Sequence, residues 1–336
     1  MALADVWFVI IAVLWTGFFV LEGFDFGVGA LHAVIGRSET GRRTAINTIA
    51  PFWDGNEVWL IVGIAGIFAA FPAWYATWLS ALYLGVLLLL LALIARGLAL
   101  GWRGRGTGHA WRGAWSVGLS LGSIVAPLVL GMALGALLAG LPIDKSGDFT
   151  GRVWNLFAGY GVWTGLTLVA LCLFHGATFL AFRTLNDLRE RATRWTGPLG
   201  IVALVMVAVF AVWTAFIAQP GWLSYVLLAV ALLAIVAGLW SARRGVEKRA
   251  FIATAIAMAA TVGSLFASLY PDVLVSSTDP RYSLTVAGSA SGEYALTVMT
   301  IVAVVVFPLV LLYQGYTYIV LRRRVGGDST SVDPSP

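Results

Sequence analysis

Charged residues and cysteine are both scarce in this chain of 336 residues. Asp, Glu, Lys and Arg make up 11% of the sequence, whereas 60% of it is hydrophobic and the mean hydropathy is +0.90. A soluble globular domain carries about 25% charged residues, so this composition excludes that class. The one cysteine, Cys172, excludes an internal disulfide and a thiolate metal cluster, and we expect it to pack in an apolar interior. The sequence also has no Walker A motif, which argues against the use of ATP.

What the chain does contain is a series of long apolar blocks. About 20 apolar residues are needed for a helix to cross a hydrocarbon core of about 30 Å. The sequence therefore predicts an all-α polytopic membrane protein with nine transmembrane helices. The first block lacks a basic leader and a small-residue cleavage site, so we interpret it as a retained helix. The predicted spans are 6–35, 57–71, 74–100, 113–140, 154–182, 198–218, 222–241, 250–270 and 293–321.

The basic residues alternate between the connections. Eighteen of the 21 Lys and Arg, Arg96 among them, are assigned to every second connection and to the C-terminal end. The positive-inside rule then places the N-terminus outside and the C-terminus in the cytoplasm. Such clusters suit anionic lipid headgroups and not nucleic acid. We expect one integral-membrane domain over 1–325 and a disordered cytoplasmic tail over 326–336.

Two carboxylates interrupt the first apolar block. Glu22 and Asp25 are three residues apart, which puts them on one face of a helix. A charge at the centre of a spanning helix costs about 2.5–3.5 kcal/mol on insertion scales, so such residues indicate function by default. Gly23 and Gly27 beside them allow a neighbouring backbone to approach. We expect at least one of the two carboxyls to be protonated at neutral pH, and a proton relay or ion site is favoured over a purely structural pair.

A second acidic cluster precedes the second span. Asp54, Asn56 and Glu57 lie where the chain re-enters the membrane from the cytoplasm. Asp54 could cap the helix with Glu57 returning the bond, as in a capping box. The alternative is a cytoplasmic mouth that feeds protons toward Asp25, because a proton path needs polar groups within reach of one another or of a bridging water. The spacing leaves both interpretations open.

Histidine is the remaining candidate ligand, and it is rare. His175 lies in the fifth span, where a lone histidine is more often a hydrogen-bonded core group than a ligand. Haem and metal sites in helical bundles draw on several facing ligands, which this sequence does not offer in any compact spacing. We therefore expect no haem or metal to be held by this chain alone.

The two acidic motifs together carry a family resemblance. Gly23-Phe24-Asp25-Phe26-Gly27, followed by Trp53-Asp54-Gly55-Asn56-Glu57-Val58-Trp59, resembles subunit II of the cytochrome bd-type quinol oxidases, as do His175-Gly176-Ala177 and the nine expected helices. The likeness covers nearly the whole chain except the tail.

The resemblance implies two four-helix bundles plus one peripheral helix in a bacterial plasma membrane. It implies a heterodimer with a haem-bearing subunit I, which holds haem b and haem d and oxidises quinol. This chain would support that partner and bring cytoplasmic protons to the oxygen-reducing site through Asp25 and Asp54, with Glu22 and Glu57 as weaker inferences. It leaves open whether this subunit binds a structural quinone and whether small single-helix accessory subunits join the pair.

Two rival functions remain at this stage. A proton-coupled secondary transporter could use the acids and glycines of the first span as a coupling site in a broken helix. A pure assembly scaffold would need the same acids only for stability of a complex.

Overall fold

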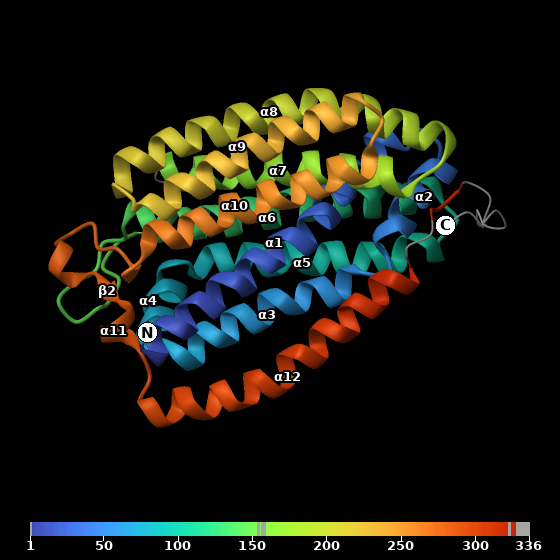
Figure 1. Ribbon diagram of the computed structural model, residues 1–336. Coiled ribbons are helices and arrows are strands. Elements are labelled where there is room, and N and C mark those ends of the chain that lie inside the picture. The colour runs from blue at the N-terminus through green and yellow to red at the C-terminus, as the bar shows by residue number, and fades with distance from the viewer. Residues whose placement is uncertain (1, 153–154, 156–158, 322–323, 327–336) are drawn as a thin grey trace.

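The computed structural model describes residues 2–152, 155, 159–321 and 324–326, and these residues are almost entirely helical. Most helices run lengthwise in one elongated bundle, and α12 runs in the same direction as α1 (Figure 1). The helices are α1 (Leu3–Ile35), α2 (Glu39–Ile49), α3 (Trp53–Ala70), α4 (Pro72–Ala81), α5 (Tyr83–Trp102), α6 (His109–Ala139), α7 (Gly159–Arg183), α8 (Asn186–Ala218), α9 (Trp222–Arg243), α10 (Glu247–Leu269), α11 (Val286–Ser289) and α12 (Glu293–Val320), with short 3-10 turns at Arg103–Arg105 and Pro280–Tyr282.

Eight of the described helices are long and apolar enough to cross a membrane: α1, the segment that contains α5, and α6, α7, α8, α9, α10 and α12. The predicted span at 57–71 corresponds to α3, which is not among the eight. Asp54, Asn56 and Glu57 occupy the first turns of α3 and lower its apolar content. The structure therefore supports a polytopic helical membrane protein, with α3 as the one predicted span that composition alone does not support.

Three features of the helices differ from the sequence-based expectation. An amphipathic helix, α2, occupies the first connection and buries Ala45, Ile46 and Ile49. The span predicted at 74–100 is divided at Leu82 into α4 and α5. Helix α8 begins at Asn186, well before the predicted start at 198. Its first turns are polar, so the apolar segment that predicted the span does not include them. The first residues of the predicted span 154–182, and the predicted tail beyond Gly326, lie outside the described residues.

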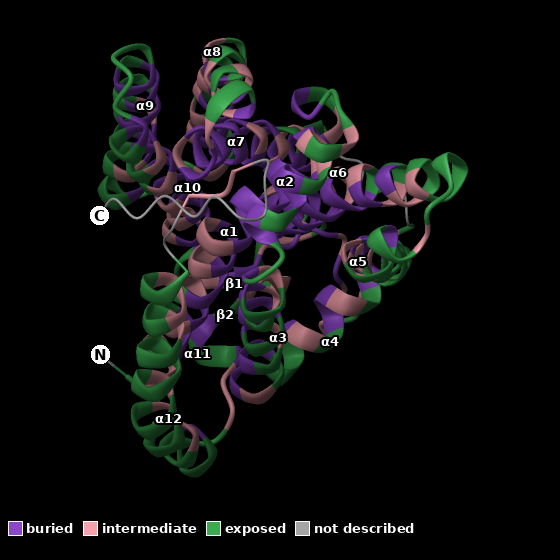
Figure 2. Ribbon diagram, turned by 90° about the vertical axis from the view of Figure 1, so that its right-hand side faces the viewer, coloured by how far each residue is buried: buried purple, intermediate pink, exposed green. Residues whose placement is uncertain are grey.

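Helix α1 lies at the centre of the molecule. It packs against α3, α6, α7 and α10, and Figure 2 shows it in the middle of the bundle, whereas the outer helix α12 is largely exposed. Aromatic side chains fill the core around it, including Trp15, Phe18 and Phe19. Burial of side chains this large is the main contribution to packing at the centre of the bundle. The polar side chains Glu22, Asp25 and His32 of α1 are therefore enclosed by protein.

Helix α12 is attached at the periphery. Leu296 is its one buried residue among those described, and its outer face exposes large apolar side chains such as Leu312. Figure 2 shows the helix set apart from the rest of the bundle. Trp7 of α1 donates to the Thr300 hydroxyl at 3.0 Å near one end of α12, and Arg183 donates to the Leu321 carbonyl at the other. Apolar exposure on this scale marks a surface covered by lipid or by another membrane subunit.

A small polar cap closes the end of the bundle at which α1 begins. Strands β1 (Asp272–Leu274) and β2 (Leu284–Thr285) pair antiparallel, with Asp272 opposite Thr285. The Leu141 amide donates to the Val275 carbonyl at 3.0 Å, which ties the end of α6 to this hairpin. Burial of the Asp272 carboxyl raises its pKa above the ordinary range.

Candidate functional site

The two carboxylates of the first apolar block are fully enclosed. Helix α1 is continuous from Leu3 to Ile35, so Glu22 and Asp25 lie on an unbroken helix, and both are 0% exposed. The charges of the two carboxyls act on one another. The structure thus brings the predicted acidic pair together at the centre of the bundle.

A buried arginine lies between the acids of α1 and α3. Arg96 of α5 forms an ion pair with Glu22, in which both side chains are 0% exposed, and a second with Glu57 at 2.7 Å. Its guanidinium also lies over the Phe26 ring, 4.8 Å from the centroid, in a cation–π contact. Two carboxyls share one guanidinium, so the charges of these three side chains balance when one of the carboxyls holds a proton.

Arg96 was assigned wrongly from the sequence. The charge count placed it in a cytoplasmic connection, but it lies inside α5 and is fully buried. Without Arg96 the count is still 17 basic residues against three, so the predicted asymmetry does not depend on it. The signal that could have found Arg96 was its position within the apolar block 74–100, where an isolated arginine needs an acidic partner.

Asn56 joins Asp25 to two other helices. Its side-chain amide donates to Asp25 Oδ2 at 2.7 Å and to the Leu21 carbonyl at 3.0 Å. Its carbonyl oxygen accepts from Gln314 Nε2 at 2.9 Å and from the Tyr318 hydroxyl at 3.0 Å. The Asn56 side chain is thereby fixed between α1 and α12, and Asp25 receives a hydrogen bond that suits its ionised form.

Asp54 and Glu57 have different surroundings. The N-cap of α3 is Phe52, with no side-chain cap hydrogen bond, so the capping-box interpretation of Asp54 is wrong. The Asp54 side chain is exposed on the outer side of α3, although its charge is close enough to act on Glu57. Glu57 is 21% exposed and pairs with Arg96. Of the four predicted acids, Glu22 and Glu57 pair with Arg96, Asp25 bonds to Asn56 on the same face of α1 as Glu22, and Asp54 lies outside these contacts.

Gly23, Gly27 and His175 lie between α1, α7 and α10. A side chain at Gly27 would collide with the Cys172 carbonyl and with Gly176, and one at Gly23 would lie 3.0 Å from Met258 Cε. His175 is fully buried; its Nε2 donates to the Val20 carbonyl at 3.2 Å and its Nδ1 lies 2.6 Å from the Thr254 hydroxyl. Its ring stacks on Phe251 at 4.6 Å. Both ring nitrogens are therefore engaged within the protein.

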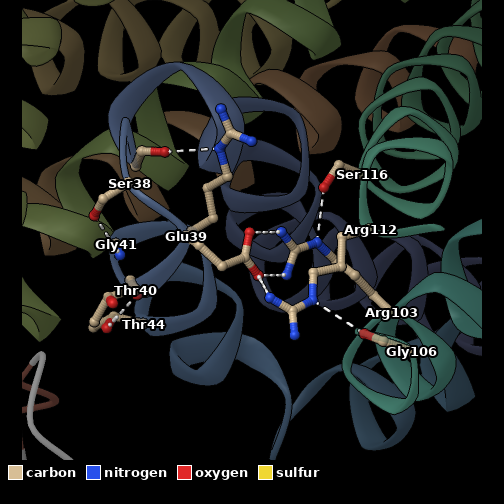
Figure 3. Close-up of polar contacts among 11 residues, drawn as sticks. Ser38, Glu39, Thr40, Gly41, Thr44, Arg103, Gly106, Arg112 and Ser116 are labelled. Carbon is tan, nitrogen blue, oxygen red and sulfur yellow. Dashed lines mark hydrogen bonds and ion pairs between the residues drawn. The ribbon is translucent and has the colours of Figure 1, made fainter. Parts of the chain in front are cut away.

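A second charged cluster lies at the end of the bundle where α1 ends. The Glu39 carboxylate receives two hydrogen bonds from Arg103, at 2.9 and 2.8 Å, and lies 3.8 Å from Arg112 (Figure 3). Arg103 Nε donates to the Ser116 hydroxyl at 2.7 Å. Partial burial acts to raise the pKa of Glu39, but the hydrogen bonds and charge of Arg103, with the nearby Arg112 and Arg42, outweigh it and hold that pKa below its ordinary value. This cluster fixes α2 to the start of α6.

A metal site is not apparent in the part of the chain that the structure describes. No group of three or more His, Cys, Asp or Glu side chains there is arranged to hold a metal ion. Glu22, Asp25 and Glu57 take part in the ion pairs and hydrogen bonds described above.

Comparison with known proteins identifies the family. The family model described as cytochrome bd terminal oxidase subunit II matches residues 3–321. The chain belongs to this family. It is 40% identical over 328 residues to "Cytochrome bd ubiquinol oxidase subunit 2" of Bacillus subtilis strain 168, covering 96% of this chain and 97% of that protein. It is 33% identical over 357 residues to "Cytochrome bd-I ubiquinol oxidase subunit 2" of Escherichia coli K12, covering 95% and 94%.

A solved structure supports the same fold. A chain of the bd oxidase from Geobacillus thermodenitrificans superimposes with a TM-score of 0.78 at 19% sequence identity, covering 96% of this chain and 98% of that one. The curated relatives are subunits of an oxidoreductase complex, so the resemblance drawn from the two acidic motifs is confirmed. Subunit 2 implies at least one further subunit.

Proposed function

We propose that this chain is the non-haem subunit of a membrane-bound quinol oxidase, in a heterodimer with a haem-bearing subunit I. It supports that partner and conducts cytoplasmic protons to the oxygen-reducing site there. Family membership and the names of the relatives support the enzyme class. The observation that carries the proton role is the burial of Glu22, Asp25 and Arg96, with Glu57 paired to Arg96 at the edge, because ionisable groups are maintained at membrane depth mainly for function.

The proposed path runs from α3 to α1. Asp54 and Glu57 are the acids of α3 that reach the outside of this chain, and Glu57 is linked through Arg96 to Glu22. Asp25 lies three residues beyond Glu22 and is oriented by Asn56. Reduction of oxygen to water consumes protons, and carboxyls that share one cation can pass them by hydrogen bonds and bridging waters. Arg96 holds the carboxyls together and does not itself release a proton.

The haems belong to the partner in this proposal. Haem iron takes His, Met, Cys or Tyr ligands with a free donor atom. Both nitrogens of His175 are hydrogen-bonded, and Met258 packs against Gly23. His175 and Met258 are therefore not available as haem ligands, and no step of the path is assigned to a haem in this chain. Quinol is a substrate of the complex.

We further propose nine crossings, with the N-terminus outside and the C-terminus in the cytoplasm. In this arrangement α3 is a crossing and α4 with α5 form one. The contacts α7–α8, α8–α9, α9–α10 and α7–α10 support one four-helix bundle, and α1, α3, α5 and α6 form the other, with α12 peripheral. Arg37, Arg43 and Arg105 near one end of the bundle, and Lys145 and Arg281 near the other, fit this orientation.

A secondary transporter is less well supported. That hypothesis needs a helix broken at the acids, so that helix ends and free backbone groups bind the coupling ion. Helix α1 is continuous through Glu22, Asp25 and Gly29. The exposed apolar faces of α12 instead suit a membrane partner.

The test uses the assembled complex. Asp25→Asn and Asp54→Asn should each lower quinol-oxidase turnover about tenfold or more, as loss of a proton-transfer group does, while haem content per complex is unchanged. Asp187→Asn is the matched control, because Asp187 is a surface residue of α8 with 86% of its side chain exposed. Wild-type turnover in both variants would exclude the proton role. Loss of the complex without loss of rate per haem would indicate an assembly scaffold.

A further inference from the structure

A polar strip between α1 and α6 lies outside the path from Asp54. On α1, Asp25, Gly29 and His32 follow at spacings of four and three residues, which places them on one face. On α6, Ser116, Ser120 and Ser123 follow at the same spacings. The two faces meet: the Ser120 hydroxyl lies 3.4 Å from the Gly29 carbonyl oxygen, and a side chain at Gly29 would collide with the Ser123 hydroxyl.

His32 presents an unused basic nitrogen in this strip. The ring is 0% exposed, and its Nδ1 lies 2.7 Å from the Gly29 carbonyl oxygen. Because a carbonyl only accepts, Nδ1 carries the hydrogen, and Nε2 of the neutral ring is an acceptor. That Nε2 is buried and has no hydrogen-bond partner. A buried polar atom without a hydrogen-bond partner lowers the stability of the fold unless a small ligand forms that hydrogen bond.

Ser123 is the second incomplete group. Buried hydroxyls of the neighbouring α7 donate to a carbonyl of their own helix, as Thr164 does to Tyr160 and Thr178 does to His175. The Ser123 hydroxyl, which is 2% exposed, has no partner. Thus two buried polar atoms without partners lie near one glycine, whose missing side chain allows the Ser123 hydroxyl to approach α1 closely.

The strip connects two charged clusters. At its outer end, Ser116 accepts from Arg103, which holds the partly exposed Glu39 (Figure 3). At its inner end, Gly122 packs against Arg96, and a side chain at Gly122 would lie 3.0 Å from Arg96 Cβ. The guanidinium of Arg96 pairs with Glu22. Side chains one turn apart on a helix are about 5–6 Å apart, a gap that one water molecule bridges.

We propose that His32 and Ser123 bind a water molecule and exchange protons through it, a site that we call the station. The station links the Glu39–Arg103–Ser116 cluster to Glu22 and Asp25. It is a second inlet for protons, beside the one at Asp54. A proton arriving through water is taken by the Nε2 lone pair of His32 and leaves from the same atom to the water shared with Ser123. No covalent bond between heavy atoms changes. Nδ1 stays bonded to Gly29 throughout, so the ring keeps its orientation. This inference rests on the proposed proton role of Asp25.

The station is tested in the assembled, haem-containing complex by turnover and by the solvent isotope effect. His32→Asn keeps a donor for Gly29 but cannot take a proton, and Ser123→Ala removes only the hydroxyl. Each alone should lower turnover less than about twofold, because the inlet at Asp54 remains, and each combined with Asp54→Asn should lower it more than the product of the single effects, with a larger isotope effect. Ser289→Ala is the matched control, since Ser289 is another buried serine without a partner and lies in α11.

The outcomes separate the two proposals. If Asp25→Asn slows turnover but the double variants equal Asp54→Asn alone, the second inlet is overturned and the proposed function stands. If Asp25→Asn turns over at the wild-type rate, both are overturned. A structure of the complex in which waters are visible gives an independent check that does not depend on variants folding. A water bonded to His32 Nε2 and Ser123 Oγ is expected, and a dry contact there would overturn the station.

Discussion

The guanidinium of Arg96 is paired with the Glu22 carboxylate, and neither side chain is exposed to solvent. These residues are 74 positions apart in sequence, on α5 and α1, and the pair holds the two helices together through charge. A buried ion pair contributes little net stability, but removal of one partner leaves an uncompensated charge. The pair therefore fixes where the acids lie at some cost to the fold.

Replacement of Arg96 by methionine should destabilise the subunit by about 3–5 kcal/mol, since Glu22 and Glu57 lose their common cation. The measurement is the thermal midpoint of the purified complex, followed by size-exclusion chromatography with haem absorbance. Arg105→Met is the control and should change stability by less than about 0.5 kcal/mol, because Arg105 is exposed at the end of α5. Equal midpoints for the two variants would contradict the account.

Gly27→Ala should separate α1 from α7. The added methyl would meet the Cys172 carbonyl and the Gly176 backbone, neither of which can rotate away. Overpacking of this kind costs about 1–3 kcal/mol or more. Gly113→Ala in α6 is the matched control: nothing lies within 4 Å of its added methyl, so better helix propensity should stabilise by up to about 1 kcal/mol. Opposite shifts in thermal midpoint are expected, and a stable Gly27→Ala variant would refute the close packing.

The attachment of α2 should depend on pH through Glu39. Arg103 and its neighbours lower the pKa of this carboxyl in the folded state, so the stabilisation is present above the ordinary glutamate pKa of about 4.3. It is lost as the pH falls through the lower folded value. Hydrogen exchange of the α2 amides should be slower in the wild type than in Glu39→Gln at pH 6, and the two should converge as the pH falls through the lowered folded pKa of Glu39. A difference that persists in acid would contradict this role.

The sequence predicted much of the architecture because its strongest signals are local. The apolar blocks indicate the helices, and the basic residues in every second connection indicate the order in which they cross. Glu22 and Asp25 stand out because they are carboxylates within an apolar block. Other features have weaker local signals. Helix α4 ends before Leu82 without a proline or glycine at that position, and the amphipathic α2 is too short to be predicted as a span.

The partners of the acids could not be predicted in the same way. Arg96 meets Glu22 only because α5 packs beside α6 and α6 beside α1, and that arrangement is not encoded in any local pattern. Asn56, and not the neighbouring Asp54, bonds to Asp25 because α3 begins at Trp53 and turns Asp54 outward. No local pattern assigns a role to His32, because the Ser123 hydroxyl beside Gly29 comes from a different helix.

The most direct test of the central claim is proton uptake during a single turnover. The fully reduced complex is mixed with oxygen in the presence of a pH-indicator dye, with wild type and Asp25→Asn compared at equal haem content. The account predicts that uptake by Asp25→Asn is slowed about tenfold or more while the initial binding of oxygen is unchanged. Proton uptake at the wild-type rate in Asp25→Asn would contradict the claim that this subunit carries protons.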